Sequence, residues 1–235
     1  MTVVLFDLDD TLFDHAAAVR SGVAAHRRTV GLDGDEAEEF ARWHALEEKH
    51  YHRYLAGELT FLDQRRERVR GFVEPFPIDL PDDDHADEWF GAYLLEYEKA
   101  WTLHADTLPC LDELRDRGIG LGVITNAERS FQLRKLDALA LTARMEHIVA
   151  SGDLGFAKPD ARIFAHAIEL FGVPAAEAVY VGDRLETDAL GAARAGLTGV
   201  WIDRHGLASA EELARAAEAG VRVIRSLAEL PPLLG

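Results

Sequence analysis

Two carboxylates follow the first apolar run of the chain at a spacing of two residues. Residues 3–6 are uncharged and apolar, and Asp7 and Asp9 come directly after them. This pattern predicts a buried strand that delivers Asp7 at its carboxyl end, where open α/β sheets hold their ligands. A turn after Asp7 would bring Asp9 back beside it, and two neighbouring carboxylates repel each other unless a divalent cation lies between them. The spacing therefore indicates a cation site.

Further polar residues follow later apolar runs or precede a helix. In chain order they are Thr125 and Asn126 after residues 121–124, Lys158 before a proline, and Asp183 and Asp188 after residues 178–182. We expect these distant segments to converge around Asp7, because the carboxyl ends of parallel strands share one edge of a sheet.

The chain prefers arginine to lysine, since its only lysines are Lys49, Lys99, Lys135 and Lys158. A lysine kept before the proline indicates that an ammonium is needed there.

Strands and helices alternate from residue 105 onward. The expected strands are 121–125, 147–150, 178–181, 199–202 and 221–224, and the expected helices are 111–117, 128–139, 159–171, 187–195 and 210–219. Helix 128–139 carries apolar residues at Phe131, Leu133 and Leu136, and Pro159 is expected in the first turn of helix 159–171. Ser209 and Glu212 match a capping box. This alternation predicts an α/β fold with a Rossmann-like parallel sheet and helices on both faces.

Residues 14–104 hold almost no strand-like run. The segments 16–29, 35–55, 60–72 and 85–101 read as four helices separated by glycine and proline. We therefore expect a four-helix-bundle-like domain at 14–104, inserted into a core made of 1–13 and 105–235.

Four motifs occur in the order D-x-D-x-T at 7–11, T-N at 125–126, K-P at 158–159 and G-D-x4-D at 182–188. In this order they resemble the haloacid dehalogenase (HAD) superfamily, and the helical insert resembles the C1-type cap of its phosphatase-like members. The resemblance covers nearly the whole chain.

The resemblance implies a role for each motif residue. Asp7 would attack phosphorus and form an aspartyl-phosphate. Asp9 would protonate the leaving oxygen and later activate water, with the hydroxyl of Thr11 fixing its position.

The other motifs would bind phosphate and metal. Thr125 and the backbone N–H of Asn126 would bind phosphoryl oxygens, and Lys158 would neutralise the anion and orient Asp7. The implied ligands of Mg²⁺ are Asp183, a carboxylate oxygen of Asp7 and the backbone carbonyl of Asp9. Asp188 would support the site by holding a metal-bound water or Lys158.

Composition narrows the possible partners. The chain has 235 residues, 48% of them hydrophobic, and a net charge of −17. The charge argues against nucleic acid and against an anionic membrane surface. Because no secretory leader, membrane-spanning run or second cysteine beside Cys110 is evident, we expect a cytoplasmic protein without an intrachain disulfide.

The favoured hypothesis is a magnesium-dependent phosphatase acting on a small phosphorylated metabolite, such as a nucleotide, a sugar phosphate or phosphoglycolate. A haloacid dehalogenase would need neither Asp9 nor Asp183, whereas a phosphomutase would keep the same motifs. A regulatory binding protein on a retained HAD fold is the non-enzymatic alternative, although no motif residue is lost. Substrate choice is expected in the cap, where Arg65 and Arg68 share a helical face that either contacts a second anionic group or is solvated.

Overall fold

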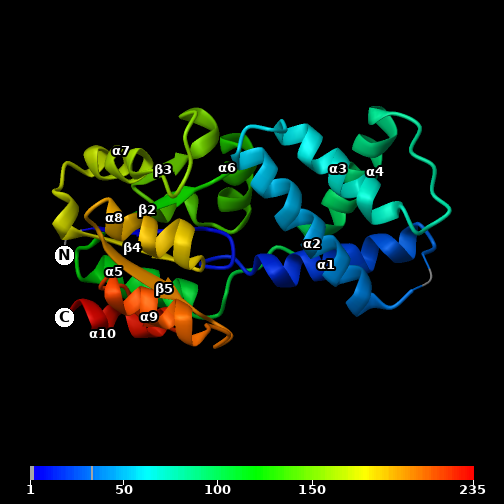
Figure 1. Cartoon of the computed structure of the whole chain (residues 1–235). Coiled ribbons are helices and arrows are strands. Elements are labelled where there is room, and N and C mark those ends of the chain that lie inside the picture. Colours follow the sequence, from blue (N-terminus) through cyan, green and yellow to red (C-terminus); the bar gives the residue numbers. More distant parts are fainter. Residues whose placement is uncertain (1–2, 33) are drawn as a thin grey trace. The chain divides into compact units, whose positions relative to one another are not determined.

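The computed structural model describes residues 3–32 and 34–235, and over these residues the chain forms two compact units. One unit comprises Met1–Asp14 and Thr102–Gly235, and the other comprises His15–Trp101. Met1, Thr2 and Asp33 fall within the ranges predicted for the two domains but lie outside the described residues. Figure 1 follows both units along the chain.

The first unit is built on a parallel sheet that has six strands in the described residues, in the order β3-β2-β1-β4-β5-β6. The strands are β1 (Val3–Phe6), β2 (Gly120–Thr125), β3 (His147–Ala150), β4 (Ala178–Gly182), β5 (Thr198–Ile202) and β6 (Arg222–Ile224). All residues of the central strands β1 and β4 are buried, as expected for strands covered on both faces. The predicted parallel α/β sheet is confirmed.

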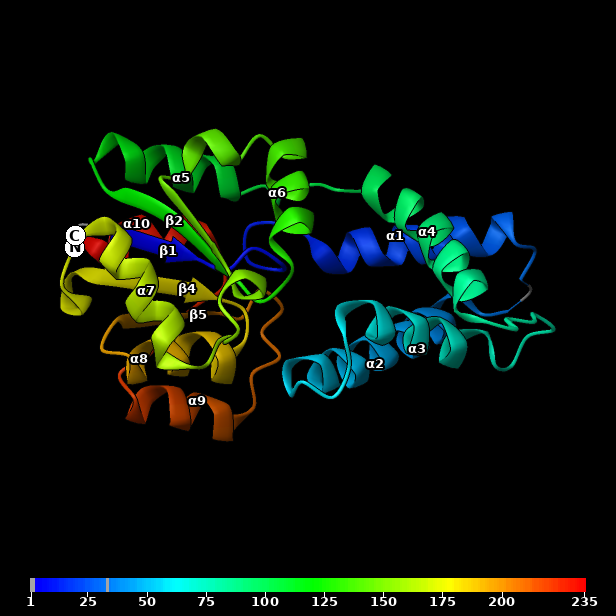
Figure 2. The same ribbon diagram turned by 90° about the horizontal axis from the view of Figure 1, so that it is seen from above.

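Helices cover both faces of this sheet. They are α5 (Thr107–Asp116), α6 (Arg129–Ala138), α7 (Ala161–Phe171), α8 (Leu190–Arg194), α9 (Ala210–Glu218) and α10 (Leu230–Leu234). Figure 2 shows α5 and α10 on one side of the strands and α7, α8 and α9 on the other. Phe164 of α7 packs edge-on against Tyr180 of β4 with 5.1 Å between ring centroids, and both side chains are completely buried.

The start of α7 differs from the prediction. Pro159 lies before the helix rather than in its first turn, and Asp160 is the capping residue. The Asp160 carboxylate accepts a hydrogen bond from the N–H of Arg162 at 2.9 Å, so a capping side chain sets the first turn. The predicted capping box at Ser209 and Glu212 is confirmed.

The predicted continuous helix at 187–195 is also wrong. The chain makes a wide π-helical turn at Leu185–Ala189 before α8 begins at Leu190. Within this turn the carboxylate of Asp188 accepts a hydrogen bond from the backbone N–H of Arg184 at 3.0 Å. A π-helical turn commonly marks a place where a side chain is aimed at a functional site.

The second unit contains α1 (His15–Thr29), α2 (Glu36–Leu55), α3 (Phe61–Val73) and α4 (Asp83–Lys99). Within the described part of the chain, α1 packs on α2 and α4, and α3 packs on the same two helices. The predicted helical character of this stretch is confirmed. No helix among the described residues combines the length and apolar character needed to span a membrane.

Aromatic side chains fill the interior of this unit. Trp43 is completely buried, and its ring centroid lies 4.4 Å from that of Tyr93 and 5.2 Å from that of Phe72. The ring centroid of Trp89 lies 5.6 Å from that of Phe72, and Trp89 is also buried. Burial of side chains this large supplies much of the stability of a small helical unit.

The expectation of an accessible charged face at Arg65 and Arg68 is wrong for Arg68. Its guanidinium is buried, pairs with Glu47 at 2.6 Å and donates to Gln64 at 2.9 Å. Burial alone would raise the pKa of Glu47, but Arg68 and His15 outweigh it and hold that pKa well below its usual range. Arg65 stacks over the ring of Phe61 at 4.1 Å.

The Arg68–Glu47 pair gives a stability prediction. Arg68→Met would leave the Glu47 carboxylate without its arginine and with His15, at 3.5 Å, beside it, and we expect the unfolding free energy to fall by about 3 kcal/mol. Urea unfolding followed by tryptophan fluorescence measures this change. The control is Arg53→Met, whose pair with the exposed Glu58 should contribute less than about 1 kcal/mol. Equal losses in the two variants would contradict a stabilising buried pair.

Candidate active site

The candidate active-site side chains lie at the carboxyl edge of the sheet. Asp7 follows β1, and its N–H donates to the carbonyl of Val181 at 2.8 Å. Thr125 is the last residue of β2, Asp183 follows β4, and Lys158 lies between β3 and α7. Because the strands are parallel, all of these positions lie at one edge.

The ammonium of Lys158 is the centre of this arrangement. Its Nζ lies 2.6 Å from Asp7 Oδ1, 2.8 Å from Asp188 Oδ1 and 2.7 Å from the hydroxyl oxygen of Tyr180. The lysine is only 3% exposed. Burial alone would lower the pKa of Lys158, but the nearby Asp188 and Asp7 outweigh it and raise that pKa well above its usual value. The group therefore stays protonated.

The backbone of Lys158 is tied to the end of β2 by one side chain. Asn126 Oδ1 accepts a hydrogen bond from the N–H of Lys158 at 2.8 Å. Asn126 Nδ2 donates to the backbone carbonyl of Lys158, also at 2.8 Å. This reciprocal pair fixes the place of a loop residue relative to the sheet. The Asn126 side chain thus positions the lysine, in addition to the phosphate contact expected of its backbone.

Carboxylates gather around the same point. Oxygen atoms of Asp7, Asp183 and Asp188 all lie within 4.8 Å of one another. Burial, with repulsion from Asp188 and Asp9, raises the pKa of Asp7 to about 7 against the opposing effect of Lys158. Burial and the same kind of repulsion raise the pKa of Asp183 well above its usual value.

These carboxylates fit a divalent cation. One ammonium does not neutralise three acids, and burial together with repulsion among these acids raises the pKa values of Asp7 and Asp183. Oxygen donors of this kind are the ligands that Mg²⁺ prefers, and a doubly charged ion at this point would relieve the repulsion.

The position of Asp188 depends on the glycine before Asp183. A Cβ on Gly182 would lie 2.4 Å from Cβ and Cγ of Asp188, which is closer than real carbon atoms approach. Glycine at this point lets the Asp188 side chain pass over β4 and reach Lys158.

The loop after Asp7 is folded back on itself. The N–H of Phe13 donates to the carbonyl of Leu8 at 3.0 Å. Arg204 donates to the carbonyl of Thr11 at 2.6 Å and pairs with Asp106 at 3.0 Å. These contacts hold the backbone around Asp9 beside the site.

The expected bond between Thr11 and Asp9 is absent. The Thr11 hydroxyl is completely buried and has no hydrogen-bond partner among the described residues. Gln132 instead donates from Nε2 to Asp9 Oδ2 at 3.0 Å, and Lys135 forms an ion pair with Asp9 Oδ1. The same Nε2 donates to the hydroxyl oxygen of Thr125 at 2.7 Å.

Gln132 and Lys135 were not predicted from the sequence as site residues. Both lie on α6 and are 1% exposed. One signal was available for Lys135, because the reasoning that a lysine retained in an arginine-preferring chain is needed applies to it as well as to Lys158.

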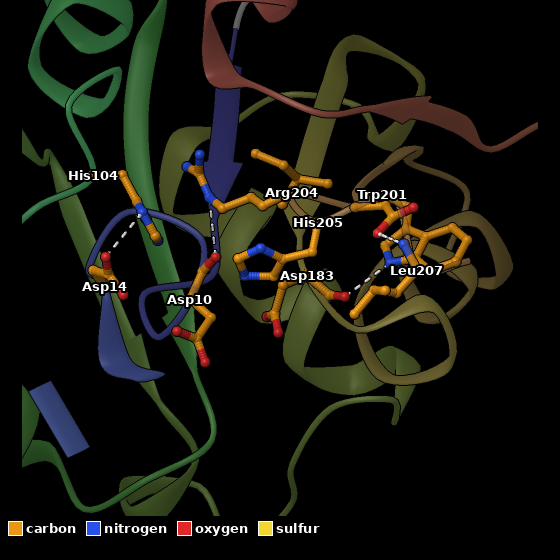
Figure 3. A pocket seen from close by; sticks show the side chains of 10 residues that line it. Asp10, Asp14, His104, Asp183, Trp201, Arg204, His205 and Leu207 are labelled. Atoms are coloured by element: carbon orange, nitrogen blue, oxygen red, sulfur yellow. Dashed lines mark hydrogen bonds and ion pairs between the residues drawn. The ribbon is translucent and has the colours of Figure 1, made fainter. Parts of the chain in front are cut away.

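A pocket of about 140 Å³ lies beside Asp183. Figure 3 shows the side chains that line it, and among these His104 pairs with Asp14 at 3.7 Å. The lining residues are Asp10, Asp14, His104, Asp183, Trp201, Ile202, Asp203, Arg204, His205 and Leu207. Trp201 donates from Nε1 to the carbonyl of Asp183 at 2.8 Å and so fixes the backbone of that acid.

Comparison with known proteins agrees with this geometry. A hydrolase family model, described as haloacid dehalogenase-like hydrolase, matches residues 1–196. A phosphoserine phosphatase of Thermus thermophilus is 32% identical over 225 residues, which cover 87% of this chain and 89% of the relative. A glyceraldehyde 3-phosphate phosphatase of Methanopyrus kandleri is 34% identical over 204 residues, covering 86% and 83%. The solved structure of a 2-haloacid dehalogenase from Pseudomonas syringae is 28% identical with a TM-score of 0.67, covering 100% of this chain and 98% of that one.

The raised pKa of Asp7 predicts a pH dependence of stability without added metal. Its pKa is about 7 in the folded chain against an ordinary value of 3.8. Between these values the folded state holds a proton that the unfolded state has lost, so this group makes the unfolding free energy fall as pH rises, by about 1.4 kcal/mol per pH unit. Asp7→Asn removes the group, and its unfolding free energy relative to the wild type should therefore rise from pH 4 to pH 7.

Chemical unfolding at several pH values measures this difference. The exposed Asp116→Asn variant is the control, and its difference from the wild type should stay constant. A constant difference for Asp7→Asn as well would contradict the raised pKa.

Proposed function

The chain belongs to the haloacid dehalogenase-like hydrolase family, and on that premise we propose that it is a magnesium-dependent phosphatase acting through an aspartyl-phosphate on Asp7. The observation that carries the proposal is the 2.6 Å contact between Lys158 Nζ and Asp7 Oδ1, inside a cluster that also contains Asp183 and Asp188. The Lys158 ammonium offsets the charge on Oδ1 of Asp7, and the other carboxylate oxygen can act as nucleophile. The two phosphatases among the relatives support the same reaction class.

In the first half-reaction an oxygen of Asp7 forms a bond to phosphorus. The bond from phosphorus to the leaving oxygen breaks, its electron pair stays on that oxygen, and Asp9 supplies the proton. Thr125 accepts a hydrogen bond from Gln132 and so keeps its own hydroxyl proton for a phosphoryl oxygen. The N–H of Asn126 would bind a second phosphoryl oxygen.

In the second half-reaction a water oxygen attacks the phosphorus of the aspartyl-phosphate. Asp9, now a carboxylate, takes a proton from this water. The bond between phosphorus and Asp7 breaks, inorganic phosphate leaves and the Asp7 carboxylate is restored. Lys158 stays paired with Asp7 and Asp188 and offsets the negative charge throughout.

Asp7, Asp183 and the backbone carbonyl of Asp9 would hold the magnesium ion. When bound, the ion supplies positive charge that neutralises the phosphoryl oxygens. Asp188 supports the site through its contact with Lys158.

We propose that the helical unit is a cap domain, at 14–104, that selects a small phosphorylated metabolite. A nucleotide, a sugar phosphate or phosphoglycolate fits the proposal, and the relatives' names give phosphoserine and glyceraldehyde 3-phosphate as substrates, which are also small phosphorylated metabolites. Arg68 is excluded as a contact for a second anionic group, since its guanidinium pairs with Glu47.

Dehalogenation is the main alternative, because a solved dehalogenase shares the fold. That reaction attacks carbon with the first aspartate and needs neither a metal nor an acid at the second position. The presence of Asp9 and Asp183 favours phosphoryl transfer. A phosphomutase differs only in the fate of the phosphoryl group, and a binding protein would show no turnover.

Phosphate release from a panel of phosphorylated metabolites, with and without Mg²⁺, tests the proposal. We expect release that requires Mg²⁺ and that Asp7→Asn lowers by on the order of 10³-fold or more, because the nucleophile is lost. The control is Asp116→Asn, which removes one exposed carboxylate from the same unit and should retain activity.

Other products would identify the alternatives. Chloride released from 2-chloropropionate without metal would indicate a dehalogenase. A phosphorylated isomer in place of inorganic phosphate would indicate a mutase. Full activity of Asp7→Asn would contradict the assigned nucleophile.

A further inference from the structure

We propose that Lys135 and Gln132 of α6 are positioning residues that hold the Asp9 carboxylate, and thereby couple it to the phosphate-binding hydroxyl of Thr125. The inference rests on the proposed function and adds residues outside the four motifs. It is carried by contacts inside the first unit, between residues more than a hundred positions apart in the chain.

Lys135 is a buried cation with a restricted environment. The residue is 1% exposed, and its ammonium forms an ion pair with Asp9 Oδ1. The same Nζ lies 4.7 Å from the ring centroid of Phe13 and 5.3 Å from that of Phe131. The contacts with these two rings and with the Asp9 carboxylate help to fix the position of the charge.

Gln132 takes the other oxygen of Asp9. Its Nε2 has two hydrogens, which lie toward Asp9 Oδ2 at 3.0 Å and Thr125 Oγ1 at 2.7 Å. The reversed amide would point its oxygen at a carboxylate, which is repulsive. The buried Oε1 has no hydrogen-bond partner among the described residues, so the donor contacts determine the orientation of the amide.

The two side chains act together because of their spacing. Residues three apart project from one side of a helix, and here each binds a different oxygen of the same carboxylate. This fixes both the position and the plane of the Asp9 side chain, which is otherwise one-third exposed on a loop. Gln132 also keeps that carboxylate at a set distance from Thr125.

Positioning matters most when the leaving oxygen needs a proton. A general acid must lie within hydrogen-bond distance of that oxygen, and small displacements cost large factors in rate. A weakly basic leaving group departs without a proton and should tolerate a displaced Asp9. If Lys135 or Gln132 no longer holds Asp9, we therefore expect a fall in rate whose size depends on the leaving group.

The test compares phenyl phosphate with 2,4-dinitrophenyl phosphate, using kcat/KM because it reports the steps up to formation of the phosphoenzyme. For Lys135→Met we expect kcat/KM to fall about 10²-fold on phenyl phosphate and less than about threefold on the dinitrophenyl ester. Gln132→Leu also removes the hydrogen bond to Thr125, so we expect a loss on both esters that is larger on phenyl phosphate. Lys135→Arg should recover part of the activity on phenyl phosphate. Equal losses on both substrates, or no loss on either, would overturn the proposal.

Arg134→Met is the matched control, since it removes the same charge from the neighbouring, exposed position of α6. Its kcat/KM should stay within about twofold of the wild type on both substrates. Urea unfolding of each variant checks that the fold is intact, and Gln132→Leu and Lys135→Arg carry the comparison if Lys135→Met does not fold. A wild type that hydrolyses neither these esters nor any phosphorylated metabolite of the panel would overturn the proposed function as well, whereas an active wild type with an unselective Lys135→Met would overturn this inference alone.

Discussion

The buried ammonium of Lys158 is the interaction on which the candidate site depends. It contacts Asp7, Asp188 and Tyr180, which come from the loop after β1, from the turn before α8 and from β4. Carboxylates this deeply buried are costly unless a cation and hydrogen bonds satisfy them. The lysine therefore lets the acids stay close together, and it contacts one oxygen of Asp7 while leaving the other for the proposed attack on phosphorus. Asn126 secures the arrangement by bonding both backbone polar groups of the lysine.

A second lysine, Lys135, forms an ion pair with the second acid, Asp9. Asp7 and Asp9 are two residues apart, yet each is paired with a different cation, Lys158 in one case and Lys135 in the other. Each of the two carboxylates thus has a cation of its own, which suits the different tasks proposed for them. Asp183 has no such lysine in the described structure, and burial, followed by repulsion from Asp188 and Asp7, raises its pKa. A divalent cation would offset both effects.

The parts of the fold that follow from local pattern were predictable. Short apolar runs ending in polar residues gave the strands before Asp7 and Asp183, and the sheet confirms them as parallel and buried. Features set by long-range contacts were not predictable. The sequence predicted a helix with apolar residues at Phe131, Leu133 and Leu136, but the buried residues of α6 are Gln132, Lys135 and Leu136. Nothing in a 3.6-residue period tells which polar side chain will meet a carboxylate far away in the chain. The same holds for the π-helical turn at Leu185–Ala189, whose form depends on how Asp188 reaches Lys158.

The covalent role of Asp7 can be tested most directly by trapping the phosphoenzyme. An excess of protein is mixed with a hydrolysed substrate, quenched within one turnover, reduced with borohydride and mapped by mass spectrometry. An aspartyl-phosphate is reduced to homoserine, so we predict homoserine at position 7 in the substrate-treated protein and aspartate there in protein without substrate. Homoserine at another aspartate, or unmodified Asp7 in an enzyme that is turning over, would contradict the central role given to this carboxylate and its lysine.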